Sequence, residues 1–321
     1  MSLEILWTLP TSGDGRSSQT PRPATLDYLA DVARAVEFAG FDAVFLPSGR
    51  NHLDPFLVAA GLAPKTSRLN FLVSFRAGLV LPAVVAQQIQ TLQNLSHNRI
   101  QLHLNTSETV DQRASYGDLT DSDILPEQIF EFVSTLQAVW RGRPLHHEGL
   151  HFRIQGGGLL RPLATIPSID IDAHDKALFG LAAEHAERIF LDVKSHEDLR
   201  PQIQQLRELA AVRRRNVKIA LHLSIVSRDT EEEAWSDSER WGSKVLTENE
   251  SHHSVVIGSH QSVIDRLLRW KEIGVDSLVL SSYPHLEEAL RVSEEILPSL
   301  RSSSTSETLV SLGSNPPGVR P

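Results

Sequence analysis

The chain alternates between short apolar runs and longer segments with helical periodicity over almost its whole length. The apolar runs of the β type lie at residues 3–9, 42–47, 69–81, 99–106, 167–172, 188–193, 217–226 and 276–282. Between them, apolar residues such as Leu29, Val32 and Val36 recur every three or four positions, which is the spacing of one buried helix face. Eight strands separated by helices predict parallel β/α architecture. They favour a single (β/α)8 (TIM) barrel over an open doubly wound sheet.

Two segments depart from this alternation. Residues 145–159, with the sequence LHHEGLHFRIQGGGL, predict a small hairpin inserted before the fifth strand. Residues 301–321 are rich in Ser, Gly and Pro, which is typical of a disordered tail. We therefore expect one domain over residues 1–300.

Composition narrows the possible partners. The 321 residues include 31 basic and 40 acidic side chains, for a net charge of −9, so nucleic acid is not an expected partner. The absence of cysteine excludes disulfides, thiolate catalysis and cysteine-ligated zinc. No segment approaches the run of about 18 apolar residues that a membrane span needs. Because the N-terminus also lacks a signal-peptide pattern, we expect a cytoplasmic protein without a membrane partner.

Polar side chains gather where the predicted strands end, which is the face that carries the chemistry of a (β/α)8 barrel. Alternation along each strand, with the residues that directly follow it, assigns the following residues to this mouth: Arg50, His52, Ser74, Arg76, His103, Asn105, Asp170, Asp172, His174, Asp192, His222, Ser224 and Tyr283. By contrast, Arg188 is assigned to the outer face of a helix. The fifth strand, in the stretch PSIDIDAHDK, concentrates the most negative charge at this mouth.

Several segments resemble a known family. LPTSGDGR, FLPSGR, residues 69–106 and GVDSLVLSSYPHLEEALRV closely resemble the bacterial luciferase-like flavin monooxygenases, and the nearest branch is alkanesulfonate monooxygenase. The resemblance extends from Leu3 to Leu300. Members are (β/α)8 barrels that take reduced FMN from a separate NAD(P)H-dependent flavin reductase. Oxygen adds to that flavin, which then oxidises a small-molecule substrate. The resemblance therefore implies an FMN-dependent enzyme, and a homo-oligomer as in most branch members.

The resemblance also implies roles for individual residues. It gives catalytic roles to His222, Tyr283, His52 and Arg76. It gives contacts with the flavin or its phosphate to His103, Asn105, Asp172, Ala173, His174 and Asp175.

The chain departs from the branch at several positions of this predicted site, and two of the departures concern the phosphate and the cover of the site. The branch has a Gly- and Ser-rich turn around the phosphate, where this chain has Asp172 and Asp175. A carboxylate about 4 Å from a phosphate costs about 4 kcal/mol per charge pair at an effective dielectric near 20, so we expect these acids to repel it. The long loop that covers the branch's site is reduced to residues 246–262, which predicts a short or missing lid.

Three functions stay open at this point. The first is a flavin-dependent monooxygenase with a remodelled site. The second is a luciferase-fold protein that has lost flavin and acts as a scaffold or binds another small molecule, because fold alone does not establish activity. The third is a metal site in which Asp172 and His174 chelate an ion, with His52, His103, Asp192 or His222 completing the ligands.

Overall fold

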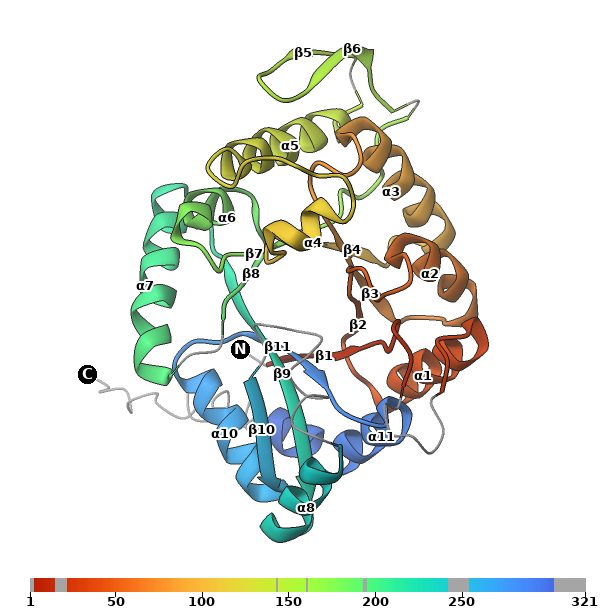
Figure 1. Ribbon diagram of the computed structural model, residues 1–321, viewed down its shortest axis with the longest axis vertical. Coiled ribbons are helices and arrows are strands. Elements are labelled where there is room, and N and C mark those ends of the chain that lie inside the picture. Colours follow the sequence, from red (N-terminus) through yellow and green to blue (C-terminus); the bar gives the residue numbers. More distant parts are fainter. Residues whose placement is uncertain are drawn as a thin grey trace, which may run out of the picture.

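The computed structural model describes residues 3–14, 22–142, 144–159, 161–192, 195–241 and 254–302. Within the described part of the chain, eight parallel strands form a closed barrel at the centre of the molecule (Figure 1). In chain order, the strands are β1 (Glu4–Thr8), β2 (Ala43–Leu46), β3 (Asn70–Phe75), β4 (Ile100–Leu104), β7 (Ile169–Asp172), β8 (Arg188–Phe190), β9 (Lys218–Arg228) and β11 (Ser277–Ser281). Parallel pairing of β8 with β9, and of β11 with both β9 and β1, closes the ring. The predicted (β/α)8 barrel is confirmed.

Helices surround the barrel as an outer ring (Figure 1). They are α1 (Leu26–Ala39), α2 (Pro55–Leu62), α3 (Pro82–Ser96), α5 (Leu125–Trp140), α6 (Phe179–His185), α7 (His196–Val212), α10 (His260–Glu272) and α11 (His285–Glu295). Local chemistry sets their starts: the Asp54 side chain caps α2 ahead of a proline at the first helical position. The outward-facing residues Leu221, Leu223 and Ile225 of β9 belong to one continuous core with the buried helix faces. Their predicted outward packing is therefore confirmed.

The inside of the barrel is charged at the N-terminal ends of the strands. Arg188 on β8 pairs with Asp170 on β7 at 2.7 Å and with Glu4 on β1 at 3.0 Å. Its guanidinium also donates to Gln101 on β4, and Lys218 on β9 pairs with Glu4 at 2.6 Å. The expectations that Arg188 lies on a helix surface and Asp170 at the mouth are wrong. Both residues lie on strands, in inward positions at the end opposite the mouth.

Above this charged layer, the barrel is filled by an apolar layer. It consists of Leu6, Ala43, Phe45, Leu72, Phe190, Ala220 and Val279. These residues hold the inward positions of their strands, in keeping with the layered packing of such barrels. The polar residues of the mouth lie above this layer, so the floor of the mouth is partly aromatic.

Three structural elements are added to the (β/α)8 barrel. The predicted hairpin is present as β5 (Leu145–Glu148) paired antiparallel with β6 (Arg153–Gly157). A short helix, α4 (Val110–Ala114), follows β4. An unpredicted strand, β10 (Ser254–Ser259), pairs with the far half of β9 from Leu223 to Arg228, next to α8 (Glu231–Trp241).

Only part of the predicted lid region and of the predicted tail lies within the described residues. Residues 246–253 of the reduced lid region and residues 303–321 of the expected tail lie outside them. Within the described ranges, no helix is both long and apolar enough to cross a membrane.

Candidate active site

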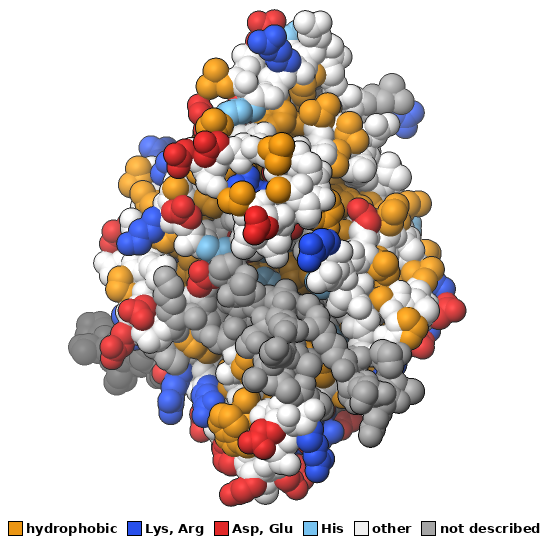
Figure 2. All heavy atoms as spheres, viewed as in Figure 1, with side chains coloured by type: hydrophobic (Ala, Val, Ile, Leu, Met, Phe, Trp, Pro, Cys, Tyr) orange, Lys and Arg blue, Asp and Glu red, His pale blue; other side chains and the backbone are white. Residues whose placement is uncertain are grey.

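Four aromatic rings form the floor of the barrel mouth. His222 on β9 stacks on Phe190 with ring centroids 4.7 Å apart and contacts Phe45 at 4.8 Å. His103 on β4 meets Phe190 edge-on at 4.8 Å. His222 keeps 8% of its surface exposed and His103 only 2%, so of these two imidazoles His222 is the one that a ligand in the mouth can reach. Figure 2 shows histidine side chains near the centre of this face.

A row of hydrogen bonds holds His103 in place. Its Nε2 lies 2.8 Å from Asp172 Oδ1, and its Nδ1 lies 3.2 Å from Ser74 Oγ. Ser74 Oγ is 2.9 Å from Ser48 Oγ, which accepts a hydrogen bond from the amide of Asn105 at 3.3 Å. The row therefore joins the rim at Asn105 to the buried carboxylate of Asp172.

Asp172 also belongs to a charged cluster at the end of β7. His174 Nε2 lies 3.6 Å from the second oxygen of Asp172, and His174 Nδ1 lies 2.5 Å from Asp192. Burial alone would lower the pKa of His174, but Asp172 and then Asp192 raise it to about 10, so His174 is an imidazolium at neutral pH. Burial would raise the pKa of Asp172, but His103 and His174 together hold it well below its usual range.

The groups of the turn after β7 are bonded within the chain. The carboxylate of Asp172 is turned into the barrel and is buried. The backbone N–H of Ala173 donates to Phe190 within the sheet, and the carboxylate of Asp175 accepts the N–H of Ala177. Of the two acids expected to repel a phosphate, only Asp175 has its side chain exposed at the turn.

The connection after β4 covers one side of the mouth. Arg76, at the end of β3, pairs with Glu108 at 2.9 Å, and its guanidinium lies 3.8 Å from the centre of the Tyr116 ring. Arg113 on α4 donates to the carbonyl of Thr120. These contacts tie the segment that carries α4 to the barrel rim, and Figure 1 shows α4 in front of the strands.

The other expected site residues lie around the rim with partners of their own. His52 Nδ1 is 2.8 Å from Thr11 Oγ1. The Tyr283 ring meets that of His285 edge-on at 4.7 Å, and His285 Nδ1 lies 3.1 Å from Asp14.

The structure thus brings His222, His103, Asp172 and His174 into one cluster and places His52, Arg76 and Tyr283 around it. The sequence reasoning missed Phe45 and Phe190 as part of the floor. Phe45 lies two residues after the inward residue Ala43, and Phe190 lies two residues after the inward residue Arg188. This alternation is the signal that could have identified them.

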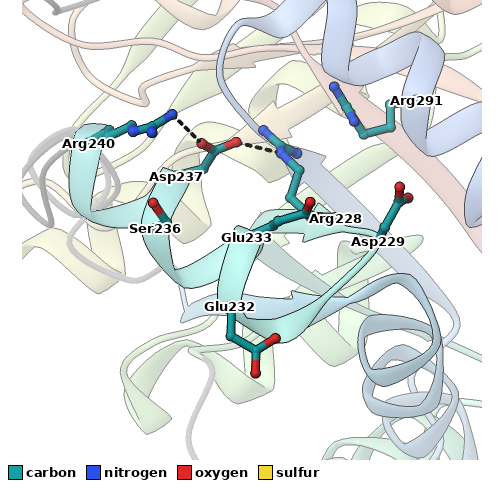
Figure 3. A pocket seen from close by; sticks show the side chains of 8 residues that line it. All are labelled: Arg228, Asp229, Glu232, Glu233, Ser236, Asp237, Arg240 and Arg291. Carbon is teal, nitrogen blue, oxygen red and sulfur yellow. Dashed lines mark hydrogen bonds and ion pairs between the residues drawn. The ribbon is translucent and has the colours of Figure 1, made fainter.

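A second hollow lies away from the mouth, between α8, the end of β9 and α11 (Figure 3). Its volume is about 490 Å³, and its lining is charged. Arg228 pairs there with Asp237 at 2.6 Å and with Glu288 at 3.0 Å, and Arg240 reaches the other oxygen of Asp237. These cations are engaged by carboxylates, and the pair of Arg228 and Glu288 is buried. The hollow is therefore lined by a network of ion pairs, and the mouth is the candidate active site.

Comparison with known proteins identifies the family and the fold. The family model for luciferase-like monooxygenases matches residues 3–255, which is most of the chain. EDTA monooxygenase (EmoA) from Chelativorans sp. BNC1 superposes with a TM-score of 0.82 at 18% identity, over 95% of each chain. DmoA from Hyphomicrobium sulfonivorans gives 0.80 at 18% identity, over 94% of this chain and 88% of that one.

A third solved structure is riboflavin lyase (RcaE) with modified FMN and its substrate riboflavin. It gives a TM-score of 0.82 at 19% identity, over 95% of this chain and 92% of that one. At these identities the structures establish the shared fold, and the family match rests on the sequence itself. This chain belongs to the luciferase-like monooxygenase family.

Proposed function

We propose that the chain is the oxygenase component of a two-component flavin-dependent monooxygenase. It receives reduced FMN from a separate NAD(P)H-dependent flavin reductase in the cytoplasm and oxidises a small organic molecule. The observation that carries the proposal is the aromatic floor with the reachable imidazole of His222, at the face where such barrels keep their chemistry. Family membership supports the same class of reaction.

The described residues fit the isoalloxazine ring of FMN better than its phosphate. The ring of His222, which packs on the buried rings of Phe190 and Phe45, suits the flat face of an isoalloxazine. At the turn after β7, His174 is held between two carboxylates, and the N–H of Ala173 is engaged in the sheet. We infer that the ring system supplies most of the binding free energy and the phosphate little.

The residues of the floor and those of the rim have different roles in the proposed reaction. Bound reduced flavin supplies the electrons that activate oxygen. His222 lies where an imidazole can hold a proton at the floor of the mouth, while His103 is kept in position by Ser74 and Asp172. We assign substrate contacts to His52, Arg76 and Tyr283 at the rim, with the cover that Arg76 holds excluding water.

Titration with FMN tests the proposal directly. We expect submicromolar binding of reduced FMN in anaerobic buffer, measured by flavin absorbance and fluorescence. With a flavin reductase, NADH and oxygen present, we expect product from one of a panel of small substrates, with alkanesulfonates tested first. No binding of reduced or oxidised flavin at millimolar concentration would exclude the proposal.

One observation favours a second candidate, a luciferase-fold protein that binds a different small molecule without flavin. It is the turn after β7, whose described groups bond within the chain. The same titration separates the two functions, because only the first requires flavin binding.

We also propose that the chain forms a homo-oligomer. Leu57 on α2 and Leu81 at the start of α3 are exposed by 74% and 62%, and α2 and α3 are neighbours on the barrel. Contiguous exposed apolar patches mark contact surfaces, and we infer that these two side chains belong to one. Light scattering coupled to size-exclusion chromatography measures the mass, and a monomer at all concentrations would contradict this proposal.

A further inference from the structure

We propose that His103, Asp172 and His222 form a binding site for a divalent transition-metal ion at the floor of the barrel mouth. One ligand atom from each residue lies within 4.8 Å of those of the other two, and all three residues are buried. They come from three different strands, β4, β7 and β9. The proposal is independent of flavin binding.

The donor set selects the class of ion. Two imidazole nitrogens and one carboxylate oxygen form the facial triad that holds non-haem iron(II), and His₂-carboxylate sets also hold catalytic zinc. Calcium and magnesium prefer oxygen ligands and are disfavoured by a site with two nitrogens. Three protein ligands leave positions open on the ion, and His222, which keeps 8% of its surface exposed, is the ligand nearest to the mouth.

The barrel wall places the two imidazoles for joint coordination. The ring centroids of His103 and His222 are 5.8 Å apart with an interplanar angle of 85°. Phe190 contacts both rings, and Phe45 also touches both, so the position of each imidazole is fixed by packing. These apolar walls also exclude water, which strengthens the attraction between an ion and the carboxylate of Asp172.

Side chains that hydrogen-bond to the ligands orient them, as in other protein metal sites. Ser74 Oγ lies 3.2 Å from His103 Nδ1, which leaves Nε2 facing Asp172 Oδ1 at 2.8 Å. Histidine ligands usually make such a second bond through the ring nitrogen that does not touch the metal. Asp172 Oδ2 is meanwhile engaged by His174, so Oδ1 is the oxygen directed toward the imidazoles. An ion would take the place of the proton between His103 and Asp172.

Metal titration of the flavin-free protein tests the site. We would express the chain without a histidine tag, strip it with a chelator, and titrate Zn²⁺ in competition with a chromophoric chelator. Co²⁺ would serve as a spectroscopic probe. We expect one ion per chain, visible absorption bands with Co²⁺, and a higher melting temperature with Zn²⁺ because the ion binds the folded state.

Three variants separate this site from adventitious binding. His222→Asn removes one ligand. Ser74→Ala keeps all three ligands and removes the bond behind His103, together with the bond between Ser74 and Ser48. His97→Asn is the matched control, because His97 is an exposed residue in the left-handed conformation that asparagine tolerates. We expect Ser74→Ala to weaken Zn²⁺ binding by about 10- to 100-fold. We expect His222→Asn to weaken it further and His97→Asn to leave it unchanged.

Two results would overturn the proposal. One is the absence of stoichiometric Zn²⁺ or Co²⁺ binding to the stripped parent protein. The other is equal binding by the His222→Asn and His97→Asn variants, which would place the ion elsewhere. If His222→Asn does not fold, as judged by circular dichroism, the comparison of Ser74→Ala with His97→Asn decides in the same way. Because flavin is absent from these experiments, failure of FMN binding leaves their interpretation intact.

Discussion

Glu37 on α1 accepts three consecutive backbone N–H groups from the turn that precedes β3. Its carboxylate lies 2.9 Å from the N–H nitrogen of Ser67, 2.6 Å from that of Arg68 and 2.8 Å from that of Leu69. Burial alone would raise the pKa of Glu37, but these bonds outweigh it and lower the pKa below its ordinary value of 4.5. One side chain on a helix thus fixes a turn about 30 residues away in the sequence.

We expect Glu37→Gln to lower the free energy of unfolding by about 1–2 kcal/mol at pH 7, because hydrogen bonds to a charged group become neutral ones. The folded pKa lies below the unfolded one, so this stabilisation is present above about pH 4.5 and is lost as the pH falls through the folded pKa. Urea unfolding of parent and variant at pH 7 and pH 3 measures the difference. Asp31→Asn, in an exposed pair on the same helix, should cost less than about 0.5 kcal/mol at both pH values. A Glu37→Gln deficit that does not shrink in acid would contradict the assignment.

At the scale of single elements, the segment from Asn105 to Ile124 depends on few contacts. Arg76 holds it through Glu108 and Tyr116, and Glu108 is itself nearly buried. Loop segments held by few contacts open locally at a lower free energy than the core.

We expect Arg76→Met to release this cover. Loss of about 1.4 kcal/mol of local stability would speed amide hydrogen exchange in residues 105–124 by about tenfold, with little change in the melting temperature. Hydrogen-exchange mass spectrometry measures this, and Arg34→Met, in an exposed pair on α1, is the control. Unchanged exchange in this segment would mean that α4 is held by other contacts.

The turn after β7 makes a second element-scale prediction, which depends on flavin binding. If the ring supplies most of the affinity, FMN and riboflavin should bind within about threefold of each other. Asp175→Ser should tighten FMN by up to about tenfold, the effect of one charge at a partly wet site, and leave riboflavin unchanged because riboflavin has no phosphate. Parallel titrations with the two flavins measure both effects. An FMN preference of 100-fold or more in the parent would show that a phosphate site exists.

At the scale of the whole molecule, the charged layer opposite the mouth joins strands from all parts of the chain. Arg188 contacts Asp170, Glu4 and Gln101, and Ser277 on β11 donates to Glu4. The layer therefore connects β1, β4, β7, β8 and β11 across the barrel, and Lys218 adds β9.

We expect Arg188→Met to cost about 3–5 kcal/mol of stability, because it leaves the fully buried carboxylate of Asp170 without its cation. The double variant Arg188→Met/Asp170→Leu should recover most of that loss, since replacing a buried ion pair by apolar residues is often neutral. Equilibrium unfolding of both variants tests this. A neutral single variant, or a double variant no better than the single one, would mean that the pair is not coupled as its geometry indicates.

The sequence by itself determined the barrel and the direction of its side chains. Alternation along each strand is a local property, so it identified the inward positions of His103, Asp172 and His222 and the outward packing of Leu221. The helix caps at Asp54 and the inserted hairpin were also readable, because each depends on neighbours in the chain.

Only the tertiary structure decided which side chains meet. Sequence proximity paired Asp172 with His174, whereas its shortest contact is with His103, 69 residues away. Asp170 was misplaced because alternation gives the face of a residue but not its height in the barrel. Arg188 was misplaced because it was assigned to the preceding helix, whereas it is the first residue of β8. β10 was missed because its pairing needs the long free edge of β9, which no local pattern reveals. Strand order, register and tilt are long-range properties of the closed sheet, and they set these contacts.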